Sequence, residues 1–351
     1  MSVTDTPPLQ SGHEDGPPQG SGAGGGPPAA HGRLRGLAER HALLALLFVV
    51  AAFFTFYPPS AEIFPTSQNL SVLLGNQSTV ALLALASILP LICGYFDFSL
   101  GAIAAASSVL TAGMMANNDL PLGLAMVVGI GSGVLIGFIN GLLVTRFGLN
   151  AFVTTLGMAT LLSGLIQWYT GGQTILAGLD PRLGQFGSET LFGLPQVVYI
   201  VAVAALILWY LLAQTPFGRG LYAIGANPRS AALVGIRVRR ATWTTFVLAG
   251  GVAGVVGVMA LARTGSATAD SGNALLFPAL AAAFLGATAV RPGFFNVVGT
   301  IIGVLFVSVS VSGLTLSGAS SWASPVFNGA ALLVAVGLSH YLGQSRAARA
   351  G

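Results

Sequence analysis

The sequence predicts an all-α polytopic membrane protein with about ten transmembrane helices and with both termini in the cytoplasm. Of its 351 residues 54% are hydrophobic and only 7% are charged, whereas a soluble domain carries about 25% charged residues. The apolar residues also form separate stretches of about twenty, which is the length that a helix needs to cross a bilayer. We therefore expect a multi-pass membrane protein, in contact with the lipid bilayer.

The chain begins with a segment that is too polar and too rich in glycine and proline to pack. Its first thirty residues contain six prolines and seven glycines, so burial of side chains cannot offset the entropy of ordering. Residues 1 to 32 are therefore expected to be a disordered cytoplasmic tail. Residues 33 to 343 are expected to form the transmembrane domain, and residues 344 to 351 a second cytoplasmic tail.

Prolines, arginines and Asn/Asp clusters separate the apolar stretches and set the expected ends of the spans. Pro58-Pro59 ends the first span, Asn117-Asn118-Asp119 the third, Arg146 the fourth and Arg291-Pro292-Gly293 the eighth. The polar loop between the fifth and sixth spans has room for a short surface helix. The expected spans are residues 42 to 57, 72 to 93, 99 to 116, 122 to 145, 150 to 170, 195 to 213, 241 to 262, 274 to 290, 296 to 316 and 323 to 342.

The arginines fix the expected orientation, because cytoplasmic loops are enriched in positive charge. With the amino terminus inside, twelve of the fourteen arginines fall on the cytoplasmic side, and Arg182 and Arg263 fall outside. Glycines also recur three and four residues apart within the spans, from Gly129 to Gly141 and from Gly250 to Gly257. Such spacing lets the backbones of membrane helices approach closely.

The longest polar interval lies between the sixth and seventh spans, at residues 214 to 240, and it carries five arginines. Its middle predicts a short helix, because Asn227 can cap it and Pro228 suits its first position. Gly235 then ends the helix. Ala231 and Ala232 are small enough for this helix to seat in a groove of a soluble partner, and Arg229 can meet acidic groups at the rim.

This loop resembles the cytoplasmic loop of the ABC-importer permeases for ribose, xylose and related sugars. The similarity rests on Thr215-Pro216-Phe217-Gly218-Arg219, Leu221-Tyr222-Ala223-Ile224-Gly225, Asn227, Ala231-Ala232 and Gly235-Ile236. The resemblance implies a coupling helix that docks on an ATPase subunit, a solute-binding protein outside the cell, and a homodimer or heterodimer of permeases. The candidate coupling residues are Arg219, Asn227, Pro228, Arg229, Ala231, Ala232 and Gly235.

Few polar side chains lie within or between the spans, and these are the candidates for a substrate path. Asp97 is the one acid outside the expected outer loops and the amino-terminal region, so it either faces the path or caps the third span with help from Ser99. Its segment is similar to that family at Gly94, Asp97, Ser99 and Gly101.

Two further segments, residues 138 to 145 and 151 to 157, are similar to the same family. Their Asn and Thr side chains either bond hydroxyls along a path or bond helices of the protein itself, and Phe152 could stack on a sugar face. The candidate path residues are Asp97, Phe98, Ser99, Asn140, Phe152, Thr154 and Thr155.

The motifs that the sequence lacks restrict its function. The chain contains no lysine and hence no P-loop, so ATP and Mg²⁺ are expected to bind to a partner subunit, and no cofactor is expected here. No catalytic set, metal-ligand spacing or nucleic-acid motif is present, so the chain is not expected to be an enzyme. The sequence favours the membrane subunit of an ABC importer for an uncharged sugar or polyol. A secondary transporter, a membrane scaffold and a branched-chain amino acid permease are the alternatives.

Overall fold

The computed structural model describes residues 30 to 350, apart from the side chains of residues 30 to 39, 273 and 339 to 350. Its contacts separate two units, Met1–Leu37 and Ala38–Gly351, and the fold described below is that of the second. The glycine- and proline-rich tail expected over residues 1 to 32 lies, up to residue 29, outside the described residues.

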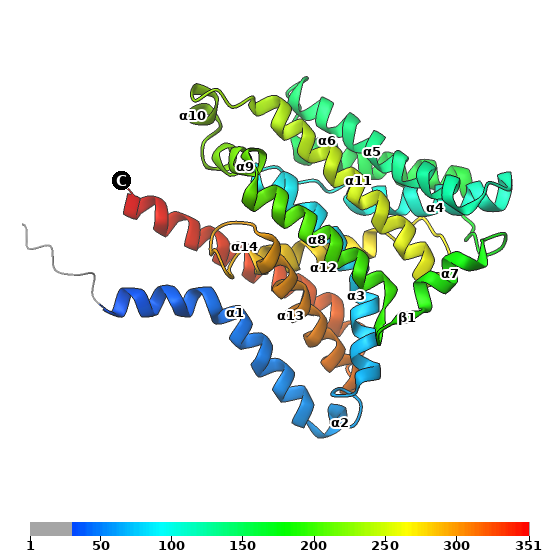
Figure 1. Ribbon diagram of the computed structural model, residues 1–351, viewed down its shortest axis with the longest axis horizontal. Coiled ribbons are helices and arrows are strands. Elements are labelled where there is room, and N and C mark those ends of the chain that lie inside the picture. The colour runs from blue at the N-terminus through cyan, green and yellow to red at the C-terminus, as the bar shows by residue number, and fades with distance from the viewer. Residues whose placement is uncertain (1–29, 351) are drawn as a thin grey trace, which may run out of the picture. The chain divides into compact units, whose positions relative to one another are not determined.

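The described part of the chain is almost entirely helical, as predicted (Figure 1). A two-residue antiparallel pair, β1 (Thr190–Leu191) and β2 (Leu194–Pro195), is its one small sheet among the described residues. The helices are α1 (Ala30–Phe56), α2 (Pro58–Ala61), α3 (Ser67–Ile92), α4 (Leu100–Asn118), α5 (Leu122–Thr145), α6 (Ala151–Thr170), α7 (Pro181–Ser188), α8 (Gln196–Gln214), α9 (Pro216–Ala226), α10 (Pro228–Leu233), α11 (Val238–Thr264), α12 (Asn273–Gly286), α13 (Val297–Leu316) and α14 (Ala323–Ala350).

Seven of these helices are long and apolar enough to cross a membrane: α3, α4, α5, α6, α8, α11 and α13. Three shorter apolar stretches, Arg40–Phe56, Ala274–Gly286 and Ala323–Leu338, lie at the other positions where the sequence predicts spans. Seven spans are therefore supported by length and composition among the described residues. The full count of ten remains a prediction, as does the side on which each terminus lies.

Glycines bring α5 and α11 together with their backbones in contact. A methyl group added at Gly133 would collide with the Gly250 carbonyl oxygen, and one at Gly137 would collide with the carbonyl of Phe246. The two helices run antiparallel, because Gly141 meets Trp243 while Gly254 meets Ile130. The predicted role of the spaced glycines in close helix packing is confirmed here.

The interior of the bundle is formed mainly by α3 and α4, whose most apolar windows are each 78% buried. The corresponding windows of α5, α6 and α8 are only 22%, 17% and 22% buried, although their mean hydropathy is as high or nearly so. Apolar helices with so little buried surface must be covered by lipid or by another protein chain. The outer faces of α5, α6 and α8 are therefore surfaces of this kind.

The two ends of the bundle differ. At one end α7, the surface helix predicted between the fifth and sixth spans, begins at Pro181 with Asp180 as its cap. Arg263 lies at this end, where its guanidinium donates to the Gly187 carbonyl at 2.7 Å and to Asn76 Oδ1. At the other end α9 and α10 lie together beyond α8 and α11 (Figure 1).

Candidate functional site

The segment between α3 and α4, residues 93 to 99, turns sharply and carries a buried acid. Gly94 has a φ of +83°, a left-handed conformation that glycine adopts without a steric penalty. Asp97 is 3% exposed, and its Oδ1 accepts hydrogen bonds from the Ser99 backbone N–H at 2.9 Å and from Ser99 Oγ at 2.6 Å. Ser99 occupies the N-cap position of α4, but its side chain makes no capping bond there. Asp97 thus fixes the residue that precedes α4.

Two neighbouring helices hold this segment in place. Asn140 of α5 donates from Nδ2 to Ser99 Oγ at 2.8 Å. Thr155 of α6 accepts from the Phe98 backbone N–H at 3.1 Å and donates to the Ala151 carbonyl of its own helix. The structure therefore brings together four of the predicted path residues, Asp97, Ser99, Asn140 and Thr155, from three separate parts of the chain.

These four side chains are closed off from solvent, because Asp97 is 3% exposed and the other three are fully buried. Most of their hydrogen-bonding capacity is used within the protein. Two oxygens are exceptions: Asp97 Oδ2 and Asn140 Oδ1 are buried and have no hydrogen-bond partner among the described residues. A buried polar group without a hydrogen-bond partner raises the free energy of the folded protein. A small shift of residues 93 to 99 that gave either oxygen a partner would therefore change that free energy.

A row of five phenylalanines runs beside the buried cluster, and we call Phe152, Phe98, Phe96, Phe284 and Phe295 the aromatic row. Successive ring centroids lie 5.2, 6.1, 5.8 and 5.1 Å apart; the first and last pairs meet edge-on, and the two middle pairs are stacked. Phe152 is 51% exposed and Phe96 is 38% exposed, so part of the row faces outward. Aromatic faces of this kind can stack on the C–H face of a sugar ring.

The sequence predicted two members of the aromatic row, Phe98 and Phe152, and missed Phe96, Phe284 and Phe295. The missed residues lie on the segment after α3, on α12 and on the segment before α13, and nothing in their spacing indicates that they meet. Thr154, another predicted path residue, lies beside Phe152 on α6 and is partly exposed. Its hydroxyl has no hydrogen-bond partner among the described residues, so it is available to a solute.

The arginine-rich loop between α8 and α11 contains two helices rather than the single helix that was predicted. The predicted helix is α10, and Asn227 caps it by accepting from the backbone N–H groups of Arg229 and Ser230. The additional helix, α9, has the same kind of start, with Thr215 as cap and Pro216 at its first position. Helix α9 was not predicted because it contains several glycines, and glycine is unfavourable in the interior of a helix.

Helix α9 touches the end of α3, which leads into the segment that carries Phe96, and the segment before α13, which carries Phe295. A methyl group added at Gly225 would collide with the Ile92 carbonyl oxygen, so α9 meets the end of α3 with no space for a side chain. Tyr222 donates its hydroxyl to the Phe295 carbonyl at 2.8 Å. Burial raises the pKa of this hydroxyl above its ordinary value, and the nearby Arg291 partly offsets that effect.

The exposed surface of α10 differs from the one expected. Ala231, predicted to seat in a partner's groove, is only 3% exposed and packs within its own loop. Ala232 is exposed, as are the two apolar residues that follow it: Leu233 exposes 88% of its surface and Val234 77%. The helix ends at Leu233, and Gly235, two residues further on, has a φ of +86°. Leu233 and Val234 were missed by sequence reasoning, although an apolar pair within a polar loop was a usable signal.

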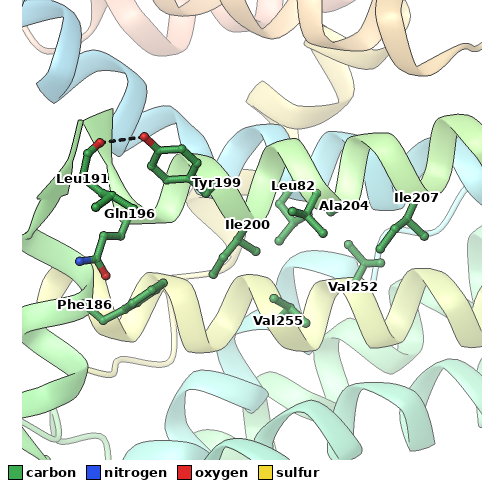
Figure 2. A pocket seen from close by; sticks show the side chains of 11 residues that line it. Leu82, Phe186, Leu191, Gln196, Tyr199, Ile200, Ala204, Ile207, Val252 and Val255 are labelled. Carbon is green, nitrogen blue, oxygen red and sulfur yellow. Dashed lines mark hydrogen bonds between the residues drawn. The ribbon is translucent and has the colours of Figure 1, made fainter. Parts of the chain in front are cut away.

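The hollow drawn in Figure 2 lies away from all of these residues. It measures about 570 Å³ and lies between α3, α8 and α11, with Phe186 of α7 and Leu191 of β1 at one end. Its lining is almost wholly apolar, and its two polar side chains are already engaged: Tyr199 donates to the Leu191 carbonyl at 2.7 Å, and Gln196 donates to Glu189. The hollow thus suits a hydrocarbon chain better than a sugar.

Comparison with known proteins gives one consistent family. Residues 69–336 match the family described as "Branched-chain amino acid transport system / permease component". The chain is 36% identical over 292 residues to the ribose import permease protein RbsC of Bacillus subtilis (strain 168), which covers 83% of this chain and 89% of that protein.

Further relatives have similar coverage. The chain is 31% identical to RbsC of Escherichia coli (strain K12), over 86% of this chain and 93% of that protein. It is 29% identical to the D-allose transport system permease protein AlsC of the same strain, over 87% of this chain and 92% of that protein. No solved structure matches the chain.

Proposed function

The chain belongs to the branched-chain amino acid transport system / permease component family, and from this premise we propose that it forms the translocation path of an ATP-driven importer for a sugar or a similar uncharged solute. It is a multi-pass membrane protein and a permease component. A bacterial inner membrane, a cytoplasmic ATPase subunit that binds ATP and Mg²⁺, and an external solute-binding protein complete the proposal.

The observation that carries the proposal is the contact of one loop helix with two parts of the chain that lead to or carry residues of the aromatic row. Helix α9 meets the end of α3 at Gly225 and bonds the segment before α13 through Tyr222. A partner that moves the loop would therefore move Phe96 and Phe295 together. The row and the exposed Thr154 hydroxyl supply what a sugar needs, namely a flat apolar surface beside a hydrogen-bonding group.

The names of the relatives favour a sugar over the alternatives, since two of them are named for ribose and one for D-allose. A secondary transporter coupled to protons would be expected to carry several ionisable groups within its spans. Among the described residues Asp97 is the one acid found between the helices rather than in the loops at the α7 end. This distribution supports energy input from a partner subunit.

The proposal is tested by transport in liposomes that contain the chain, its ATPase subunit and its solute-binding protein. Ligands for the binding protein are first found with a panel of pentoses, hexoses and branched-chain amino acids. Uptake of the bound sugar should require ATP, and Phe96→Ala should lower uptake strongly because it breaks the aromatic row at its centre. Phe56→Ala, at a phenylalanine that is 81% exposed and outside the row, is the matched control. Uptake driven by a proton gradient without ATP would refute the proposal.

A further inference from the structure

Three arginines surround a hollow at the base of the loop between α8 and α11. The hollow measures about 540 Å³ and is lined by the first turn of α9, by the residues just before α11 and by the first two turns of α11. Its arginines are Arg219, Arg237 and Arg240, and all three are exposed. Its remaining lining is Pro216, Phe217, Gly220, Ile236, Ala241 and Thr244.

No acid among the described residues pairs with the three guanidinium groups. Within the described part of the chain no hydrogen bond or ion pair involves any of these three side chains. The acids of the described loops are Asp97, which is buried and bonded to Ser99, and Glu62, Asp119, Asp180, Glu189 and Asp270. The hollow is therefore a concentration of positive charge that the described residues do not balance.

Backbone N–H groups at the start of α11 add partial positive charge to that of the arginines. Helix α11 is 27 residues long, and no side chain caps its amino end at Arg237. The first bond of the helix is made by the Ala241 N–H to the Arg237 carbonyl, and the Arg239 and Arg240 N–H groups have no partner among the described residues. Free N–H groups at a helix start favour an anion.

The position of the hollow and the apolar residues in its lining indicate which kind of anion would bind there. It lies where two apolar helices reach the membrane surface, since α8 ends at Gln214 and α11 begins at Val238. Its lining includes an apolar part, because Phe217, Ile236 and Ala241 are partly buried against the core. A free phosphate would use the arginines alone. A phospholipid would use both parts, its phosphate on the arginines and its glycerol and upper acyl chain on the apolar part of the lining.

We propose that this three-arginine hollow binds the phosphate of an anionic phospholipid. None of the residues that line the hollow belongs to α10 or to the exposed apolar pair at its end, Leu233 and Val234. It does not depend on which solute is transported. Bound lipid would anchor the base of the loop at the membrane surface while α10 engages a partner.

The test compares two triple variants of the full chain in neutral detergent by native mass spectrometry. The first is Arg219→Gln, Arg237→Gln and Arg240→Gln. The matched control removes the same charge from exposed arginines that do not line the hollow, at Arg146, Arg229 and Arg239. Each purified protein is titrated with phosphatidylglycerol, with phosphatidylcholine and with inorganic phosphate.

The wild type and the control are expected to bind phosphatidylglycerol in preference to phosphatidylcholine. A basic side chain at the membrane surface contributes about 1 kcal/mol, or about a factor of five, so the first variant should bind phosphatidylglycerol about a hundredfold more weakly. Lysine at the same three positions should restore most of the binding, which separates loss of charge from misfolding. Equal binding of phosphatidylglycerol by the glutamine variant would overturn the proposal. So would binding of inorganic phosphate as strong as that of the lipid.

Discussion

The apolar tip of α10 offers the sharpest test of how the loop engages its partner. Leu233 and Val234 expose 88% and 77% of their surfaces, which is unusual for apolar residues in a polar loop. We predict that Leu233→Ala weakens binding of the ATPase subunit far more than Arg229→Ala does. The reason is that a buried apolar anchor at the centre of an interface contributes more than an exposed charge at its rim.

The magnitude follows from the exposed fraction of the side chain. Leu233→Ala removes three carbons, each contributing about 0.8 kcal/mol when fully buried. Scaled by the 88% exposure, the loss is about 2 kcal/mol, or about thirtyfold in Kd. Arg229→Ala should cost about 1 kcal/mol or less, and that cost should shrink as salt is added.

The assay is a titration of the ATPase subunit onto the chain in lipid nanodiscs, read as Kd, beside solute-stimulated ATP hydrolysis. Leu176→Ala is the matched control, because Leu176 is 67% exposed and lies in the loop between α6 and α7. A Leu233→Ala variant that binds within twofold of the wild type would refute the reasoning. Ala231→Trp does not serve here, since Ala231 is buried within the loop and the larger side chain would strain the loop itself.

Three further predictions concern the contacts around the site. Thr155→Val should lower the free energy of unfolding of the purified chain by about 1 kcal/mol, because the partly buried Phe98 backbone N–H loses its acceptor, whereas Thr155→Ser should not. Equal melting temperatures for the two variants would contradict the role given to this hydroxyl. Gly225→Val should abolish solute-stimulated ATP hydrolysis, because the larger side chain forces α9 away from α3. The control Gly220→Ala should leave the stimulation unchanged, since its added carbon lies 3.8 Å from the nearest neighbouring atom. Stimulation in both variants would show that α9 does not take part in coupling. Tyr222→Phe should lower the free energy of unfolding by about 1 kcal/mol, because the hydrogen bond to the Phe295 carbonyl is lost. Since the pKa of this hydroxyl is raised above 10 in the folded protein, the stability difference between wild type and variant should be complete below pH 10 and should decrease as the pH rises beyond it. A stability difference that disappears at neutral pH would be the contrary result.

The sequence alone determined the fold class of the protein and most of the order of its helices. Apolar length and helix-breaking residues placed the seven long apolar helices to within a few residues, because a bilayer requires long apolar helices and the chain must interrupt them with polar residues. The cap at Asn227 and the surface helix after Asp180 were also predictable, since both depend on neighbouring residues. The family likeness in the loop and around Asp97 pointed to a permease, and the comparisons agree with it.

Tertiary structure decided which of these residues meet and which remain exposed. Phe96, Phe284 and Phe295 form one row with Phe98 and Phe152 only because helices far apart in the sequence pack together. Local patterns hold no information about such contacts, because they depend on how whole helices cross.

The same reason explains why the sequence did not predict whether certain single residues are buried or exposed. Ala231 and Ala232 are identical neighbours in the sequence, yet the first is buried in its own loop and the second is exposed. Asp97 could be a cap or a path residue on sequence grounds, whereas its buried bonds to Ser99, and through Ser99 to Asn140, require α5 to lie beside the start of α4. A side chain's surroundings are set by the partners that the fold brings to it, and those partners lie outside any local stretch of the chain.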